Sequence, residues 1–237
     1  KEASVRAYGE VARRAGVTTV TDLFSQMEED DLSTMLRVTG DDDFPLRVVP
    51  ALGATEGPKT IADKAEKLAK RSTDKLRLGA VKLMTDGSIQ GWTARVKSPG
   101  YVGGQPNGIW NTPPEMIFQL VEELHSRGIQ MHIHVNGDEA AEVSLNAIEA
   151  ALRKHPWTGH RHVLQHCQMM GRDLFTRAAD RPATSAAGAA PAGTAVALMR
   201  WSPCGVGPPR RPWRSVSGPP RASGTIPRAG CGTAWRT

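Results

Sequence analysis

The sequence contains few cysteines, few aromatic residues and no long hydrophobic run. Aromatic residues make up 5% of the 237 residues and hydrophobic residues 39%, enough for one large domain or two small ones with a modest core. No apolar stretch approaches the roughly 18 residues that a membrane-spanning helix needs. The three cysteines form no close pair, and an odd number does not suit a disulfide framework. We therefore expect a cytoplasmic protein with no membrane partner.

The first residues also lack two familiar features of a chain start. They include neither an initiating Met nor the apolar segment of a signal peptide. We expect the sequence to begin inside a longer protein.

Acidic residues and lysine are absent from the last part of the chain. Residues 181–237 contain eight Arg but no Asp, Glu or Lys, and Arg, Pro, Ala and Gly supply 36 of the 57 residues. The net charge of +6 therefore combines +8 in this tail with −2 in residues 1–180. Pro and Gly interrupt the basic residues, so we expect no nucleic-acid partner. The composition predicts an irregular low-complexity tail at 181–237, either read out of frame from a GC-rich gene or a disordered linker.

Residues 1–180 alternate between helical and strand patterns, which is typical of α/β proteins. Helices are predicted by apolar spacing, an initial Pro or a closing Gly. The predicted helices cover 4–16, 60–71, 113–128, 138–155 and a segment from 173. The predicted strands cover 17–22, 45–52, 78–84, 129–135 and 161–167, and the first of them reads as buried.

The spacing of the predicted strand ends suits a barrel. The ends fall at Asp22, Pro50, Lys82, His134 and His166, with separations of 28, 32, 52 and 32 residues. A (β/α)₈ barrel repeats at roughly 31 residues per unit, and a Gly-rich insertion at 85–111 accounts for the long step. An open doubly wound sheet fits the same spacings, but no GxGxxG turn favours it. We predict an α/β fold: a partial (β/α)₈ TIM-type barrel, domain 1–180, followed by the tail.

Three side chains at successive strand ends form the main candidate site. Lys82, His134 and His166 are predicted to point into one barrel mouth, where the active sites of such barrels lie. Two imidazoles make a partial site for Zn²⁺ or a similar divalent ion. A neutral lysine can add CO₂ and become an oxygen ligand. A single strand-end His is more often a packed core residue, but two in register with a Lys favour a metal site.

Other histidines and one cysteine have competing interpretations. His132 and His134 form an HxH pair on one strand face, so His132 is either a rival ligand or a residue packed deeper in the barrel. His125 and His155 lie on predicted helices and are expected to face solvent. Cys167 is expected to point away from the mouth as a packed thiol.

The insertion supplies candidate substrate-binding residues. Asp86 could place a carboxylate at the mouth, although Asp-Gly is also an ordinary turn sequence. Trp92, with Tyr101 and Trp110, could line an apolar substrate pocket or close the loop against the barrel rim. We predict Asp86 and Trp92 as substrate-binding residues.

Three motifs in order resemble those of a known family. The segments GAVKLMTDGSIQGWTA, IHVNGDEAA and RHVLQHCQ resemble amidohydrolase family 3, the YtcJ-like metal-dependent hydrolases, and the likeness covers residues 5–180. It implies strands two to six of a (β/α)₈ barrel. It implies that Lys82 is a carbamylated bridging lysine and that His134 and His166 are metal ligands. Gln165 stands where the family usually has Glu.

The resemblance also implies an activity. It predicts hydrolysis of carbon–nitrogen bonds, in non-peptide amides or formamides of small molecules, by a water that a divalent metal, expected to be Zn²⁺, activates. The family's HxH after strand one and its Asp after strand eight are not in this sequence, so no catalytic residue is assigned and little activity is expected of this chain. The alternatives are a Schiff-base lyase or aldolase that uses Lys82, or an inactive truncated product. Unpaired strand edges leave an oligomer open.

Overall fold

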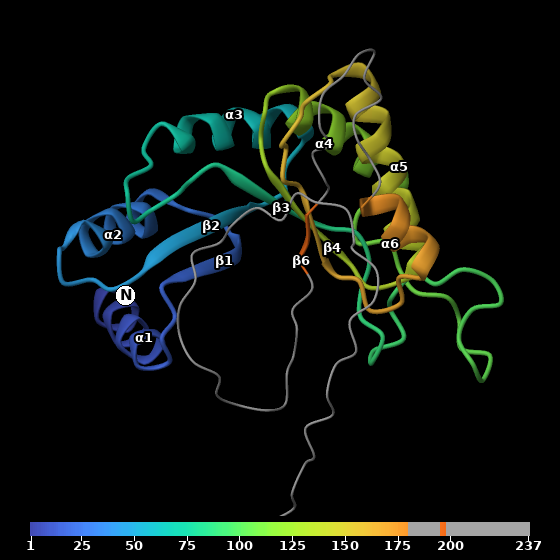
Figure 1. Cartoon of the computed structure of the whole chain (residues 1–237), viewed down its shortest axis with the longest axis horizontal. Helices are drawn as coiled ribbons and strands as arrows, with labels where there is room; N and C mark the ends of the chain where they lie inside the picture. Colours follow the sequence, from blue (N-terminus) through green and yellow to red (C-terminus); the bar gives the residue numbers. More distant parts are fainter. Residues whose placement is uncertain (180–194, 198–237) are drawn as a thin grey trace, which may run out of the picture. The chain divides into compact units, whose positions relative to one another are not determined.

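The computed structural model describes residues 1–179 and 195–197. Helices and strands alternate along these residues (Figure 1). In chain order they are α1 (Glu2–Arg14), β1 (Thr19–Ser25), α2 (Glu29–Gly40), β2 (Arg47–Gly53), α3 (Pro58–Ala69), β3 (Ala80–Met84), α4 (Pro114–Ser126), β4 (Met131–Val135), α5 (Asp138–Lys154), β5 (Val163–His166), α6 (Arg172–Ala179) and β6 (Ala195–Ala197). The remainder of the tail predicted at 181–237 lies outside the described residues.

The strands form one sheet in which neighbours in sequence are neighbours in space. Its order is β1-β2-β3-β4-β5-β6, and every pair is parallel. A helix separates each strand from the next, so the chain repeats the β–α unit of a (β/α)₈ barrel without closing it. The predicted α/β partial barrel is confirmed.

Three features of the fold differ from the sequence prediction. Helix α2 was not predicted. Strand β6, Ala195–Ala197, lies in the segment predicted to be irregular, where it pairs in parallel with β5. Strand β1 was predicted to be buried, yet all of its residues are exposed or half-buried. It lies at one edge of the described sheet, where only β2 covers it, and sequence pattern reports the polarity of a strand but not its neighbours.

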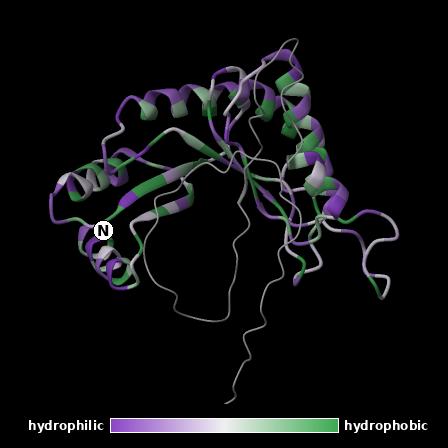
Figure 2. Ribbon diagram, in the orientation of Figure 1, coloured by the Kyte–Doolittle hydropathy of each residue, from purple (hydrophilic) through white to green (hydrophobic). Residues whose placement is uncertain are grey.

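The hydrophobic core lies between the sheet and its helices. Leu83 and Ile133 are fully buried on the helix-facing side of adjacent strands. Helix α4 starts after a proline and turns Ile117, Leu120 and Leu124 into this core. Figure 2 shows the resulting two-sided colouring of the helices, hydrophobic towards the sheet and hydrophilic outside. The alternate strand residues, among them Lys82, therefore project to the opposite face of the sheet.

Residues 85–113 connect β3 to α4 and contain the long insertion predicted at 85–111. Figure 1 shows this loop extending beyond the ends of the strands. No helix in 1–179 is long and apolar enough to cross a membrane.

Candidate functional site

A pocket of about 790 Å³ lies at the carboxyl ends of β3, β4 and β5. The three predicted metal-binding side chains all line it, although 52 residues separate Lys82 from His134 and 32 separate His134 from His166. Parallel pairing brings them together, because it places all carboxyl ends at one edge of the sheet. The lining residues are Leu23, Phe24, Ala54, Thr55, Lys82, Met84, Asn111, Thr112, His134 and His166.

Lys82 is a buried amine with a neutral partner. Only 3% of the residue is exposed, and its Nζ donates a hydrogen bond to Oε1 of Gln165 on β5. No carboxylate forms an ion pair with it among the described residues. Burial therefore lowers the pKa of Lys82 to about 8, because desolvation disfavours the charged ammonium. The neutral form is well populated near pH 8.

His134 and His166 meet edge to face, with ring centroids 4.7 Å apart. Burial lowers the pKa of both imidazoles, and the charge of Lys82 lowers both further. His134 also lowers the pKa of His166, whereas the Gly87 carbonyl and Asp86 partly oppose the lowering at His134. Both rings are therefore neutral at pH 7 and each keeps a lone pair, which is the form that binds metal ions.

The hydrogen bonds of His134 define which ring nitrogen is free. Its Nε2 lies 2.9 Å from the carbonyl oxygen of Gly87, an atom that can only accept. Nδ2 of Asn136 also lies 3.2 Å from Nε2. The shorter contact, with the carbonyl, needs the proton on Nε2, so we assign the Nε2–H form, in which Nε2 donates to Gly87. Nδ1 has no hydrogen-bond partner in the part of the chain that the structure describes, so its lone pair is available.

Asp86 lies beside the pocket but is not among its lining residues. Its carboxylate has no exposed surface. Oδ2 accepts the backbone N–H of Gly137 at 2.8 Å and of Arg95 at 3.0 Å, and Oδ1 accepts that of Asn136 at 3.0 Å. This geometry favours an internal role over the predicted contact with substrate, because the oxygens are already used and are shielded from the pocket.

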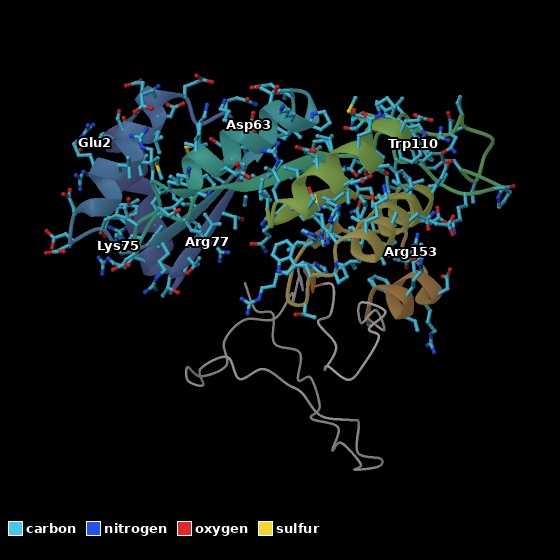
Figure 3. The ribbon with its side chains drawn as sticks, turned by 90° about the horizontal axis from the view of Figure 1, so that it is seen from above. Glu2, Asp63, Lys75, Arg77, Trp110 and Arg153 are labelled. Atoms are coloured by element: carbon cyan, nitrogen blue, oxygen red, sulfur yellow. The ribbon has the colours of Figure 1, made fainter. Side chains whose placement is uncertain are left out.

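Trp92 also lies outside the lining of the pocket. It is half exposed, and its ring packs edge to face on Tyr101 at 5.2 Å. Trp110, labelled in Figure 3, lies under the guanidinium of Arg95. The aromatic residues thus contact other parts of the insertion, and substrate binding by Trp92 stays a prediction.

His132 occupies the layer below His134. It is paired in register with Lys82, and its Nδ1 lies 3.5 Å from Nε2 of Gln165. It does not line the pocket, and burial lowers its pKa to about 4. The arrangement matches the interpretation of His132 as a packed residue rather than a rival ligand.

Of two further predictions, one agrees with the structure and the other does not. Cys167 is buried and free, and burial raises the pKa of its thiol to about 11, as expected of a packed thiol. The prediction that His125 faces solvent is wrong: only 2% of it is exposed. Its Nδ1 lies 2.9 Å from Nε2 of His162, a partner that helical position alone does not reveal.

Three polar residues of the pocket were not predicted from the sequence: Thr55, Asn111 and Thr112. Asn111 donates through Nδ2 to the carbonyl of Asp86 at 2.6 Å, and Thr112 donates to that of Met84 at 2.7 Å. Asn111 is the last residue of the insertion predicted at 85–111 and Thr112 follows it. Their position just before a helix that begins with Pro114 was the available signal.

The donor set fits a partial metal site. Within the described residues no group of three or more His, Cys, Asp or Glu is placed to hold a metal ion. Two imidazoles from consecutive strand ends supply nitrogen donors, and Lys82 is the third donor that the family resemblance implies. A protonated ammonium cannot ligate, so the lysine would have to react first.

Comparisons with known proteins agree with this fold. A model of the amidohydrolase family matches residues 1–230, which is further than the 5–180 over which we noted the motifs. YtcJ of Bacillus subtilis (strain 168), assigned as an amidohydrolase, is 36% identical over 121 residues, which are 51% of this chain and 22% of that protein.

Two solved structures share the fold. An uncharacterized metal-dependent hydrolase from Pyrococcus furiosus has a TM-score of 0.59 at 24% identity, over 74% of this chain and 35% of that one. One from Pyrococcus horikoshii OT3 has a TM-score of 0.58 at 24% identity, over 73% and 33%. The chain therefore spans about one third of the length of these structures.

Proposed function

The chain belongs to the amidohydrolase family, and we propose that it is part of a metal-dependent hydrolase that cleaves carbon–nitrogen bonds in small non-peptide amides or formamides. One observation carries this proposal: Lys82, His134 and His166 converge on one pocket at the carboxyl ends of their strands. The cytoplasmic location and the amide-type substrate stay predictions from the sequence.

We assign His134 and His166 as ligands of a divalent cation, with Zn²⁺ as the first choice because imidazole nitrogen suits it. His134 would bind through Nδ1, since Gly87 occupies Nε2–H. When bound, the cation supplies Lewis acidity, which polarises a substrate carbonyl and lowers the pKa of a water molecule.

Lys82 would join these ligands as a carbamate. The neutral amine nitrogen would form a bond to the carbon of CO₂ while one C=O electron pair moves onto oxygen. The nitrogen would then release one proton to solvent, which leaves an anionic oxygen donor. The lowered pKa of Lys82, about 8, favours this reaction because it raises the fraction of neutral amine at ordinary pH. Gln165 would release or reorient its bond to Nζ, since the carbamate nitrogen has fewer hydrogens to donate.

The polar side chains on the pocket wall support an amide-type substrate. Because Asn111 donates through Nδ2, its Oδ1 is left as an acceptor, and it has no partner among the described residues. Such an oxygen can accept the N–H of an amide, which an ester lacks. Phe24 and Met84 supply apolar surface beside it.

Metal binding by the purified chain is the first test. Zn²⁺ or Co²⁺ should be bound in competition with a chromophoric chelator, and His134→Gln or His166→Gln should weaken binding by about 10-fold or more. His155→Gln is the matched control, because His155 is exposed and does not line the pocket. Equal affinities of all four proteins would contradict the assignment.

The reaction class is tested with a panel of N-acyl amines, N-formyl amines, carboxylic esters and phosphate esters. Chelator-sensitive turnover confined to the first two supports the proposal, and turnover confined to the esters contradicts it. A low rate is expected, because the sequence lacks two ligands and a base that the family resemblance implies.

A second candidate, Schiff-base chemistry at Lys82, has one supporting observation: the amine is buried, without a counter-ion, and has a lowered pKa. Borohydride in the presence of an aldehyde would trap an adduct on Lys82 if this candidate is correct. Chelator sensitivity without trapping favours the hydrolase.

A further inference from the structure

The carboxylate of Asp86 binds three backbone N–H groups in segments next to His134. This carboxylate is fully buried, and the N–H groups belong to Arg95 in the insertion and to Asn136 and Gly137 after β4. It thereby ties the insertion to the turn that follows His134. A carboxylate that accepts backbone N–H groups makes charge-assisted bonds, which are shorter and stronger than neutral ones.

Asn136 closes a ring of contacts that returns to His134. While its backbone N–H donates to Asp86, its side-chain Nδ2 donates to the carbonyl of Gly87 at 2.7 Å. The same carbonyl accepts from Nε2 of His134 at 2.9 Å, so both of its lone pairs are used.

The Gly87 carbonyl is held firmly in place. Its own N–H donates to Thr93 at 3.1 Å, and a Cβ at this position would lie 2.1 Å from Oγ1 of the same threonine. Only glycine fits, and the carbonyl cannot rotate away without breaking these contacts.

Charge acts in the same direction as the hydrogen bonds. Oδ1 of Asp86 lies 3.5 Å from Nε2 of His134. An anionic oxygen at this distance stabilises an N–H at Nε2 and repels a lone pair there. Carbonyl and carboxylate together therefore select one tautomer.

Resting on the proposed function, we propose that Asp86 is a positioning residue for the metal site: through Asn136 and the Gly87 carbonyl it holds His134 as the Nε2–H tautomer and presents Nδ1 to the pocket. This gives a role to Asp86-Gly87 and Asn136-Gly137, two motif pairs that contribute no ligand.

The tautomer is measured on metal-free protein labelled with ¹⁵N-histidine. Long-range ¹H–¹⁵N spectra distinguish a protonated from an unprotonated ring nitrogen, and the spectrum of His134→Gln assigns the signal. Wild-type protein should show Nε2 protonated and Nδ1 unprotonated at pH 7.5. An Nδ1–H tautomer in the wild type overturns the proposal, even if the variants below fail to fold.

Asp86→Asn is the informative variant, because its amide hydrogens would face the backbone N–H groups that Asp86 now satisfies. We expect its His134 signal to move towards a mixture of tautomers and its Zn²⁺ affinity to fall about 10- to 100-fold, as for other outer partners of metal ligands.

Asp138→Asn is the matched control. It removes one carboxylate that also anchors the insertion, through the N–H of Lys97 at 2.8 Å. Within the described residues this carboxylate forms no hydrogen bond with Gly87 or His134. It should keep the wild-type tautomer and an affinity within about twofold. Equal losses in both variants, or an unchanged tautomer in folded Asp86→Asn, would show a structural role only. Because the tautomer needs no metal, the proposal can fail or hold whatever the outcome for hydrolysis.

Discussion

The Nζ of Lys82 donates its hydrogen bond to the side-chain amide oxygen of Gln165, on the strand two positions further along the sheet. A neutral partner satisfies the donor without compensating its charge. The cost of desolvation is therefore unopposed, and the pKa of Lys82 falls to about 8.

Replacing this partner by a carboxylate should reverse the effect. Gln165→Glu is expected to raise the pKa of Lys82 by roughly 1–3 units, because an opposite charge within hydrogen-bond distance favours the ammonium. The pKa can be followed by NMR after reductive ¹³C-methylation of the lysines. Gln130→Glu makes the same change on a residue that bonds to the Arg161 carbonyl instead. A pKa that stays near 8 in Gln165→Glu would contradict this account.

The sequence predicted the barrel because the fold repeats at a length that strand ends reveal. It also predicted the convergence of Lys82, His134 and His166, since strand ends in a parallel sheet share an edge. Asn111 and the burial of His125 were not predictable in this way. Each depends on a contact across tens of residues, and hydrophobic periodicity reports only which face of an element is apolar.

The role of Asp86 shows the same limit. An Asp-Gly pair after a strand indicates a turn, and a carboxylate near a site suggests a ligand or substrate contact. Only the positions of Arg95, Asn136 and Gly137 show that backbone N–H groups surround it.

The buried histidines near the amino ends of β4 and β5, His125, His160 and His162, should make the fold sensitive to acid. Met131 N–H donates to Nδ1 of His162, so His162 donates through Nε2 to His125, which donates in turn to the carbonyl of His155. His160 accepts the N–H of His162. Each imidazole nitrogen that accepts one of these hydrogen bonds must be unprotonated. The rings of His162, His125 and His160 must therefore all be neutral.

Burial lowers the pKa of His160 to about 4 in the folded protein, against about 6.5 when unfolded. The unfolded state therefore binds the proton first, and stability is complete above pH 6.5 and falls as the pH drops from 6.5 towards 4. The loss for this one residue is on the order of 3 kcal/mol.

Urea unfolding at several pH values tests this behaviour. His160→Asn keeps an acceptor near Nδ1 but cannot titrate, so its stability should fall less between pH 6.5 and 4.5 than that of the wild type. His155→Asn, at an exposed position, should follow the wild type. Parallel curves for all three proteins would mean that His160 does not carry the effect.

Arg95 and Glu139 should couple more strongly than an exposed pair of the same kind. The guanidinium donates two hydrogen bonds of 3.0 Å to the carboxylate, and the side chains are 22% and 31% exposed. A double-mutant cycle with Arg95→Met and Glu139→Gln should give a coupling energy of about 1–2 kcal/mol.

The comparison pair for this cycle is Arg71 and Glu29, whose side chains are 41% and 75% exposed. Arg71→Met and Glu29→Gln should couple more weakly than Arg95→Met and Glu139→Gln, because solvent screens the exposed pair. A coupling energy for Arg71 and Glu29 that equals or exceeds the one for Arg95 and Glu139 would contradict the prediction.

Gly137 and Gly57 allow a matched test of how closely the insertion packs against the barrel. Both are the residue before a helix, α5 and α3, and both have ordinary extended backbone angles. Alanine is therefore acceptable to the backbone at either position, and only the surroundings differ. A Cβ on Gly137 would lie 1.7 Å from the carbonyl oxygen of Arg95, whereas a Cβ on Gly57 would meet nothing within 4 Å.

Gly137→Ala should therefore displace the segment at Arg95, break its N–H bond to Asp86 and lower the free energy of unfolding by about 2–4 kcal/mol. Gly57→Ala should change it by less than about 0.5 kcal/mol. Urea unfolding measures both values, and the His134 tautomer spectrum shows whether the displacement reaches the site. If Gly137→Ala is as stable as Gly57→Ala and leaves that spectrum unchanged, the insertion does not lie against the turn after β4, and the route from Asp86 to His134 loses its support.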